Sequence, residues 1–203
     1  MQELTFAKGN EQHLKACRDA LCRSALGEKY FSSPGSAENA ILEGIYQGNL
    51  YAALIGEECV GFAYIIPGGA FHSFPYLHII AIKEEYRGKG IGKALLDYSE
   101  CIASELADRF FLVVADYNPD AKRFYERNGY QQVGEIPKLY RPGVSEYMMV
   151  VCLVHRFKDQ AGDPLSDISF FTWRISEPYS CHVIAAIFFK LTHTGSYPTD
   201  STG

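Results

Sequence analysis

Apolar and polar positions along the first 155 residues predict strands and helices in mixed order. Leu4–Gly9 alternates and predicts a first strand, whereas residues 11–26 carry Leu14, Cys17, Leu21 and Ala25 at the spacing of a single helix. After the breaker SSPGS, residues 37–49 predict a second helix. Residues 50–58 and 59–69 then predict an antiparallel hairpin that turns at Gly56 to Glu58.

Two nearly continuous apolar runs, residues 76–82 and 110–116, have the pattern of strands buried on both faces. Between them a helix is expected, with Ile91, Leu95, Tyr98, Ile102 and Leu106 on one stripe. Strand, helix and strand predict a right-handed parallel crossover. A helix over 119–127 and strands over 130–135 and 147–154 complete an expected mixed α/β fold of the α+β class, a sheet of six to seven strands with flanking helices.

The character of the chain changes near His155. Residues 1–156 are expected to form one domain, and 157–203 a C-terminal extension of unknown role. The extension contains two apolar runs, at 168–175 and 181–191. It is expected either to add strands to an open sheet edge or to contact the partner subunit of a homodimer.

Composition narrows the class of protein. With 47% hydrophobic residues, 21% charged residues and a net charge of −5, the chain has a globular composition without the basic surface of a nucleic-acid binder. Nucleic acid is therefore not an expected partner. No apolar run is long enough to span a membrane, so a membrane is not an expected partner either, and the cytoplasm is the expected location. The six cysteines form no C-x-x-C pair, which predicts reduced, mostly buried thiols and no metal site.

The turn RGKGIGK, residues 87–93, lies between a buried strand and a helix. Lys93 stands where a P-loop, or a dinucleotide turn counted from Gly88 and Gly90, requires glycine. The remaining pattern is R-x-x-G-x-G, formed by Arg87, Gly90 and Gly92. Glycines allow close approach of the backbone to an anion, helix amides point at it and the cations add charge, which predicts a pyrophosphate site without metal. The alternative is a tight strand-to-helix turn with no ligand.

This segment resembles the signature motif of the GNAT superfamily of acyl-CoA N-acyltransferases, and the resemblance covers Leu4 to about Val154. It implies a twisted sheet whose fourth and fifth strands, here 76–82 and 110–116, separate to admit the pantetheine arm of acetyl-CoA. It also implies a set of cofactor-binding residues. These are the strand backbone at Ile80, Ala81 and Ile82 for the pantetheine, and Arg87, Gly88, Lys89, Gly90, Ile91, Gly92 and Lys93 for the pyrophosphate.

A second matching segment runs from Asn118 to Tyr130. The resemblance implies that Asn118 hydrogen-bonds the cofactor arm and that Tyr125 lies beside the sulfur, where it is the expected general acid. From the residues alone, Asn118 is also a good helix N-cap with Pro119 at the first helical position. The alternative for Tyr125 is a core aromatic residue.

The candidate base is less well defined. Val113 stands where ribosomal-protein N-terminal acetyltransferases have a glutamate, whereas YLHIIAI resembles HLHVLAV of the arylalkylamine N-acetyltransferases. His78 matches one of their proton-relaying histidines, and Tyr76 takes the place of the other. Strand alternation predicts that His78 shares a face with Tyr76, Ile80 and Ile82. A hydrogen-bonded core histidine is the alternative.

The acceptor site is expected between the first two helices and the loops 67–75 and 136–146. Its expected lining is aromatic, with an acid to attract an ammonium group: Phe71, Phe74, Tyr76 and Tyr140, with Glu146 or Glu43. The resemblance implies transfer of acetyl from acetyl-CoA to a primary amine, of a small molecule or a protein, by direct attack in a ternary complex. The alternatives are an acyl-CoA-binding or structural module without turnover, and a protein or peptide N-acetyltransferase.

Overall fold

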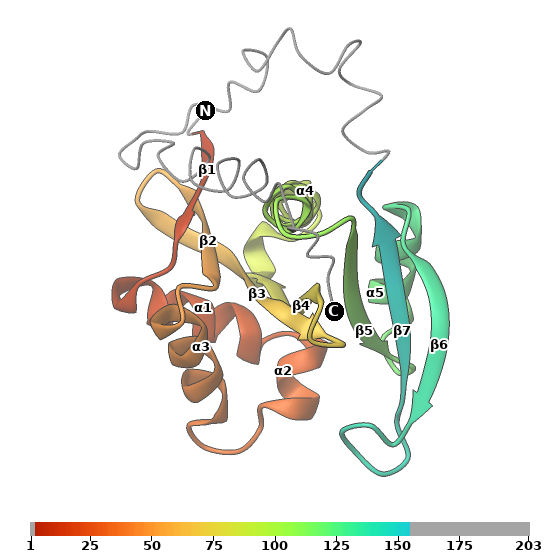
Figure 1. Cartoon of the computed structure of the whole chain (residues 1–203). Helices are drawn as coiled ribbons and strands as arrows, with labels where there is room; N and C mark the ends of the chain where they lie inside the picture. Colours follow the sequence, from red (N-terminus) through yellow and green to blue (C-terminus); the bar gives the residue numbers. More distant parts are fainter. Residues whose placement is uncertain (1–2, 155–203) are drawn as a thin grey trace, which may run out of the picture. The chain divides into compact units, whose positions relative to one another are not determined.

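The computed structural model describes residues 3–154, which form one mixed sheet with flanking helices (Figure 1). The strands are β1 (Leu4–Lys8), β2 (Leu50–Ile55), β3 (Glu58–Ala70), β4 (Phe74–Ile82), β5 (Arg109–Ala115), β6 (Gln131–Pro137) and β7 (Ser145–Cys152). The helices are α1 (Leu14–Cys22), α2 (Ala25–Tyr30), α3 (Ser36–Tyr46), α4 (Ile91–Ser104) and α5 (Pro119–Arg127), with 3-10 turns η1 (Glu11–His13) and η2 (Glu84–Tyr86). The predicted fold class is confirmed. Residues 157–203 lie outside the described residues, so the extension and its expected roles stay predictions.

The strand order is β1-β2-β3-β4-β5-β7-β6, and only the β4–β5 pair is parallel. The predicted hairpin and the parallel crossover through α4 are therefore confirmed. Strands β4 and β5 meet at one pair of partners, Tyr76 and Phe111, whereas β5 and β7 match over seven pairs. The sheet thus opens along β4 beyond Tyr76, between the β1–β4 half and the β5–β7–β6 half (Figure 1).

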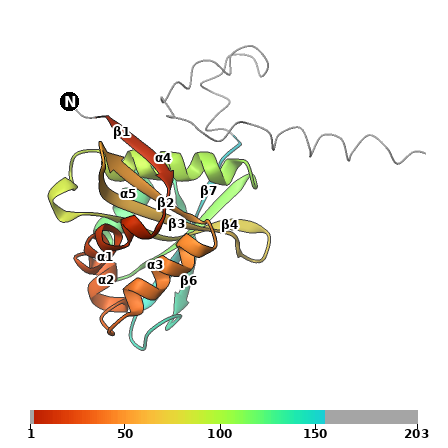
Figure 2. The same ribbon diagram turned by 90° about the vertical axis from the view of Figure 1, so that its left-hand side faces the viewer.

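Helices cover the two faces of the sheet with separate cores. On one face, α1 and α3 contribute Cys17, Leu21 and Ile41 to a core with Phe62 and Tyr64 of β3. On the other face, α4 and α5 bury side chains that include Leu95, Leu96 and Tyr125 against β3, β5 and β7. Figure 2 shows α1 and α3 on the side of the strands opposite α4.

The single helix predicted over residues 11–26 is wrong. The structure ends α1 at Cys22 and begins α2 at Ala25. Ser24 separates them, because its Oγ accepts the Gly27 N–H at 3.0 Å and donates to Leu21 O at 2.6 Å. A serine in extended conformation that accepts an amide of the first turn is a helix N-cap. The resulting bend between α1 and α2 forms one wall of the cleft described below.

A β-bulge at His78 also corrects the sequence analysis. Tyr64 pairs with Ile79 and Ile65 pairs with Leu77, so His78 is an extra residue of β4 without a partner on β3. A bulge shifts the alternation by one position. Ile80 accordingly packs against the α4 core, whereas the His78 ring contacts Tyr64 of the α1–α3 core. The expectation that His78 shares a face with Ile80 and Ile82 is therefore wrong.

All five cysteines between residues 3 and 154 are free, but only Cys17 and Cys59 are buried. Three of the six cysteines, Cys22, Cys101 and Cys152, are exposed, so the prediction that most are buried is wrong. The helices formed by residues 3–154 include none that is long and apolar enough to cross a membrane.

Candidate active site

A cleft of about 820 Å³ opens where β4 and β5 separate. Both strands contribute to its wall, β4 from Tyr76 to Ile82 and β5 from Val113 to Ala115. The cleft brings together most of the residues predicted from sequence: His78, Ile80, Ala81, Ile82, Arg87, Gly88, Gly90, Gly92, Lys93, Asn118 and Tyr125. Two of the predicted residues, Lys89 and Ile91, do not line the cleft. The Ile91 side chain is buried in the core between α4 and the sheet, and the Lys89 Nζ lies 5.1 Å from the centroid of the Tyr86 ring.

The glycine turn presents backbone amides at one end of this cleft. Gly88 and Gly90 adopt φ angles of 74° and 82°, in the left-handed region that favours glycine. Gly90 caps α4 without a side-chain hydrogen bond, and Ala94 makes the first amide-to-carbonyl bond back to Gly90. The amides of residues 91–93 therefore precede the helical ladder and, with the positive end of the helix dipole, suit an anion.

Arg87 lines the cleft, and its guanidinium donates to two backbone carbonyls. Its Nε donates to Ile82 O at 3.0 Å and its Nη2 donates to Arg23 O at 2.7 Å. The guanidinium therefore connects the end of β4 to the bend between α1 and α2. Lys93 forms an ion pair with Asp97, one helical turn further along α4. Arg87 and Lys93 thus line the cleft together with Gly88, Gly90 and Gly92 of the turn.

The two glycines at the start of α4 should respond oppositely to alanine. For Gly90→Ala we expect a loss of about 1 kcal/mol in the free energy of unfolding, because alanine disfavours φ of 82° although no atom lies within 4 Å of its Cβ. Gly92→Ala is the matched control: it is helical, its Cβ would lie 3.8 Å from Ile82 Cγ1, and it should be neutral or stabilising. Urea denaturation measures both, and equal losses would contradict the explanation.

Asn118 and Tyr125 lie on the opposite wall, at the start and on the inner face of α5. The Asn118 Oδ1 accepts the Ala121 N–H at 3.2 Å, so the predicted N-cap is confirmed and the side-chain NH₂ remains for a ligand. Tyr125 is 8% exposed, and burial raises the pKa of its phenol. Within residues 3–154 its hydroxyl has no hydrogen-bond partner, while the residue lines the cleft. Its ring packs against Tyr130, 5.5 Å away, so Tyr125 is both a core aromatic residue and a cleft residue.

His78, at the bulge of β4, lines the cleft. Its ring lies 5.3 Å from the Tyr64 centroid, edge to face, and 6.0 Å from the Tyr76 centroid. Burial lowers the pKa of His78 below its ordinary 6.5, opposed by a weaker effect of Glu43. The imidazole is therefore neutral at pH 7 and able to accept a proton.

If His78 accepts a proton during turnover, kcat should fall as the imidazole becomes protonated. Because burial places its pKa below 6.5, we expect a decline on the acid side of that value and constant activity above it. The variant His78→Gln should lose this acid limb when kcat is measured against pH at saturating substrates. An acid limb that persists unchanged in the variant would remove His78 from the mechanism.

The other end of the cleft contains a buried acid surrounded by tyrosines. Glu146 of β7 is 2% exposed, and its carboxylate accepts a hydrogen bond from the Tyr30 hydroxyl at the end of α2. The Tyr30 ring lies 6.1 Å from the Tyr117 centroid and 5.9 Å from the Tyr140 centroid. The Tyr140 hydroxyl lies 3.5 Å from that of Tyr76. We call Tyr30, Tyr76, Tyr117 and Tyr140 the tyrosine box, and all four line the cleft with Glu146.

Three residues expected at the acceptor site, Tyr76, Tyr140 and Glu146, line this cleft, whereas Tyr30 and Tyr117 were not named from the sequence. Tyr30 ends a helix and Tyr117 directly precedes the capping Asn118, positions at which the sequence shows no pattern. Their proximity follows only from the folded chain.

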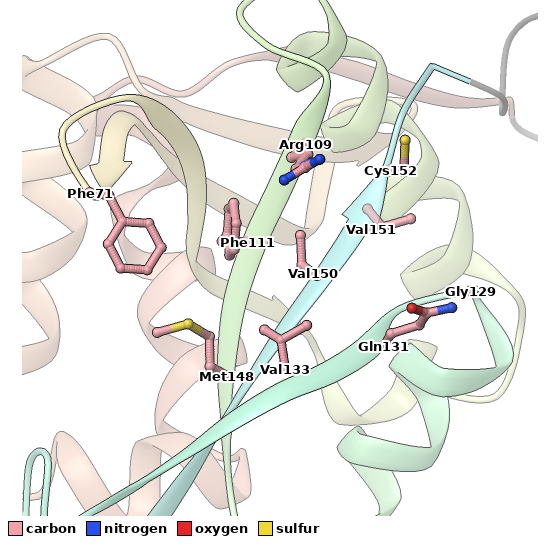
Figure 3. A pocket seen from close by; sticks show the side chains of 10 residues that line it. All are labelled: Phe71, Arg109, Phe111, Gly129, Gln131, Val133, Met148, Val150, Val151 and Cys152. Atoms are coloured by element: carbon pink, nitrogen blue, oxygen red, sulfur yellow. The ribbon is translucent and has the colours of Figure 1, made fainter.

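Phe71 and Phe74 do not line this cleft, which corrects the sequence analysis. Their rings pack on Phe111 of β5, at centroid distances of 5.6 and 5.4 Å. Figure 3 shows Phe71 and Phe111 at a second hollow, over β5, β7 and β6, with Met148, Val150 and Cys152. Phe71 of the β3–β4 loop therefore lines a different hollow, whereas Phe74 begins β4 and packs on Phe111.

Comparison with known proteins identifies the family. The family model for the acetyltransferase (GNAT) family matches residues 18–130, more than half of the chain. The chain belongs to the GNAT acetyltransferase family. The matched region includes the β4–β5 opening, the glycine turn and Tyr125, so the family resemblance seen in the sequence is confirmed. As a GNAT acetyltransferase, the chain is an acyltransferase.

GNAT relatives agree in sequence and in fold. The uncharacterized N-acetyltransferase MJ1530 of Methanocaldococcus jannaschii is 33% identical over 108 residues, which are 52% of this chain and 67% of that protein. The ribosomal-protein-S18-alanine N-acetyltransferase from Escherichia coli has 19% identity and a TM-score of 0.60, covering 81% and 100% of the two chains. An aminoglycoside 6'-N-acetyltransferase in complex with coenzyme A has 20% identity and a TM-score of 0.60, covering 74% and 97%. These two structures share the GNAT fold with this chain.

The GNAT fold of this chain offers no metal site among the residues described. Within residues 3–154, no three histidine, cysteine, aspartate or glutamate side chains gather where they could hold a metal ion. The arrangement of the cleft is that of an organic binding site: backbone amides and two strand edges at one end, and a buried acid with aromatic rings at the other.

Proposed function

We propose that the chain transfers the acetyl group of acetyl-CoA to a primary amine by direct attack in a ternary complex. The observation that carries this proposal is the continuous cleft between β4 and β5. It joins a glycine turn suited to pyrophosphate, a buried tyrosine and a buried carboxylate. Such a cleft can hold two substrates at once, and holding them together supplies much of the rate of the reaction.

The cofactor half of the cleft supports binding of coenzyme A by backbone groups. Along β4, Ile80, Ala81 and Ile82 pair with β3 on one edge, and β5 has left the other edge beyond Tyr76. The pantetheine arm would pair with this free edge and with the Asn118 amide, and the pyrophosphate would rest on the amides of residues 88–93. Arg87, Lys89 and Lys93 would act through their positive charge and through the position of the turn.

The chemistry requires a neutral amine, a proton acceptor and a proton donor. The amine nitrogen attacks the thioester carbon, the C–S bond breaks, and the departing thiolate takes the Tyr125 proton. Because burial raises the pKa of Tyr125, its hydroxyl is protonated at neutral pH and can donate. His78, neutral at pH 7, would accept the amine proton through water.

The test is a thiol-release assay with acetyl-CoA and a panel of amines, including small amines and peptides with free amino groups. We expect release of coenzyme A that depends on the amine, with N-acetylated product found by mass spectrometry. Cofactor binding without release for any amine would leave the acyl-CoA-binding module as the function. Release only with peptides would favour a protein or peptide N-acetyltransferase.

A further inference from the structure

The acceptor end of the cleft contains a negative charge without a positive partner among residues 3–154. Glu146 is 2% exposed, and the hydrogen bond to its carboxylate comes from a neutral hydroxyl, that of Tyr30. Burial raises the pKa of Glu146, and the nearby Asp116 adds to this effect. A buried carboxylate is costly unless a cation or several hydrogen bonds compensate it. An ammonium group in the cleft would supply that cation.

Glu146 shares one cleft with the expected general acid. Glu146, Tyr76 and Tyr125 all line it, and the Tyr76 hydroxyl lies 3.5 Å from that of Tyr140 in the tyrosine box. An amine held at Glu146 would therefore lie in the same cleft as Tyr125.

Two residues next to the tyrosine box carry the opposite charge, although they are not among the residues that line the cleft. Arg141 lies over the Tyr30 ring, with Cζ 5.5 Å from the centroid, and Lys29 lies over the Tyr117 ring, with Nζ 5.5 Å from the centroid. Asp116 is the acid near Tyr117, and its Oδ2 accepts the Ser145 N–H at 3.0 Å. Two box residues therefore each have a cation of the chain over one face of the ring. We call Arg141 and Lys29 the rim of the box.

We propose that the amine acceptor is an amino acid or a similar compound with a carboxylate near its primary amine. Its ammonium group meets Glu146 inside the box and gives one proton to that carboxylate, which leaves the neutral amine that attacks the thioester. Its own carboxylate meets Arg141 and Lys29 beside the box. This inference rests on the proposed transfer to an amine and names the class of acceptor. The guanidinium of Arg141 suits a carboxylate because its N–H groups match two oxygens at once.

The same charges disfavour diamines and polyamines. The second ammonium group of such a compound would meet Arg141 and Lys29, and like charges at a binding site reduce affinity. A simple monoamine would retain the contact with Glu146 and gain nothing at the rim. The structure therefore ranks acceptors as amino acids first, monoamines second and diamines third.

The experiment measures kcat/KM by thiol release for matched acceptors that differ in one group. The pairs are 4-aminobutyrate with butylamine, and phenylalanine with phenethylamine, and 1,4-diaminobutane represents the diamines. We expect each acid to exceed its matched amine by about tenfold, the size of one charge-assisted contact, and the diamine to be the poorest substrate.

Two variants assign the preference to residues, a third is their control, and a fourth tests Glu146. Arg141→Gln should remove the preference for the acids while leaving butylamine and phenethylamine unchanged, and Lys29→Gln should reduce it in part. Lys15→Gln is the matched control, because it removes one exposed positive charge of α1 that lies over no ring of the tyrosine box. Glu146→Gln should lower kcat/KM for acids and amines alike.

The outcomes separate this inference from the proposed function. Equal or higher rates for the amines, or a preference that Arg141→Gln and Lys29→Gln leave unchanged, would overturn the inference while the proposed function stands. Release with no acceptor, although coenzyme A binds, would overturn the proposed function and this inference with it. A preference for acids that is lost in Arg141→Gln and kept in Lys15→Gln would establish the acceptor class.

Discussion

Replacing Tyr125 with phenylalanine should lower kcat about 100-fold or more, since a positioned proton donor commonly contributes this much. The ring would still fill its place against Tyr130, so only the hydroxyl is lost. That hydroxyl has no hydrogen-bond partner within residues 3–154, so removal should change the free energy of unfolding by less than about 1 kcal/mol. Coenzyme A should bind as in the unaltered protein.

The measurement compares kcat by thiol release with the Kd of coenzyme A by calorimetry. Tyr98→Phe is the matched control, because Tyr98 of α4 packs on Phe6 at a centroid distance of 4.7 Å and does not line the cleft. A Tyr125→Phe variant with full kcat would exclude the phenol as the general acid. A fall in kcat shared by Tyr98→Phe would point to a loss of structure instead.

The second large effect is expected for Gly27→Ala, at the contact between α1 and α2. The added Cβ would lie 1.9 Å from Leu21 O and 2.8 Å from Cys22 Cα, and both are backbone atoms that cannot rotate away. The two helices must therefore separate, at a cost of about 3 kcal/mol in the free energy of unfolding. Since α2 carries Tyr30, we also expect the KM for the amine to rise.

Urea denaturation and steady-state kinetics measure these two consequences. Gly134→Ala in β6 is the control, because its Cβ would meet its nearest neighbour, Met148 Cβ, at 4.0 Å, an ordinary contact. Its free energy of unfolding should stay within about 0.5 kcal/mol of the original. An unfolding midpoint for Gly27→Ala equal to that of Gly134→Ala would show that the close approach of α1 and α2 is not required.

Much of the fold follows from local patterns. The hairpin at Gly56, the crossover through α4 and the cap at Asn118 each depend on residues close together in sequence, and each was predicted. The break at Ser24 was missed because the apolar spacing from Leu14 to Ala25 continues across it. A capping serine was the available signal, but periodicity does not detect caps.

The acceptor end depends on contacts that no local pattern contains. The hydrogen bond from Tyr30 to Glu146 joins positions 116 residues apart. The bulge at His78 depends on how β3 pairs with β4, so the two-residue alternation of β4 could not predict it. Most residues expected to bind the cofactor line the cleft, and they could be named from the sequence because a glycine turn and a capped helix are local features. The tyrosine box is instead assembled from four separate segments.

The single pairing between β4 and β5, at Tyr76 and Phe111, has a consequence for the evolution of this protein. Further residue pairs between β4 and β5 beyond this one would stabilise the sheet. Each pair would form hydrogen bonds between backbone N–H and C=O groups that the present gap leaves to ligand or water. The same change would close the cleft. Selection for heat resistance alone should therefore favour closed, inactive sheets, and an active chain must retain this unpaired edge at the expense of stability.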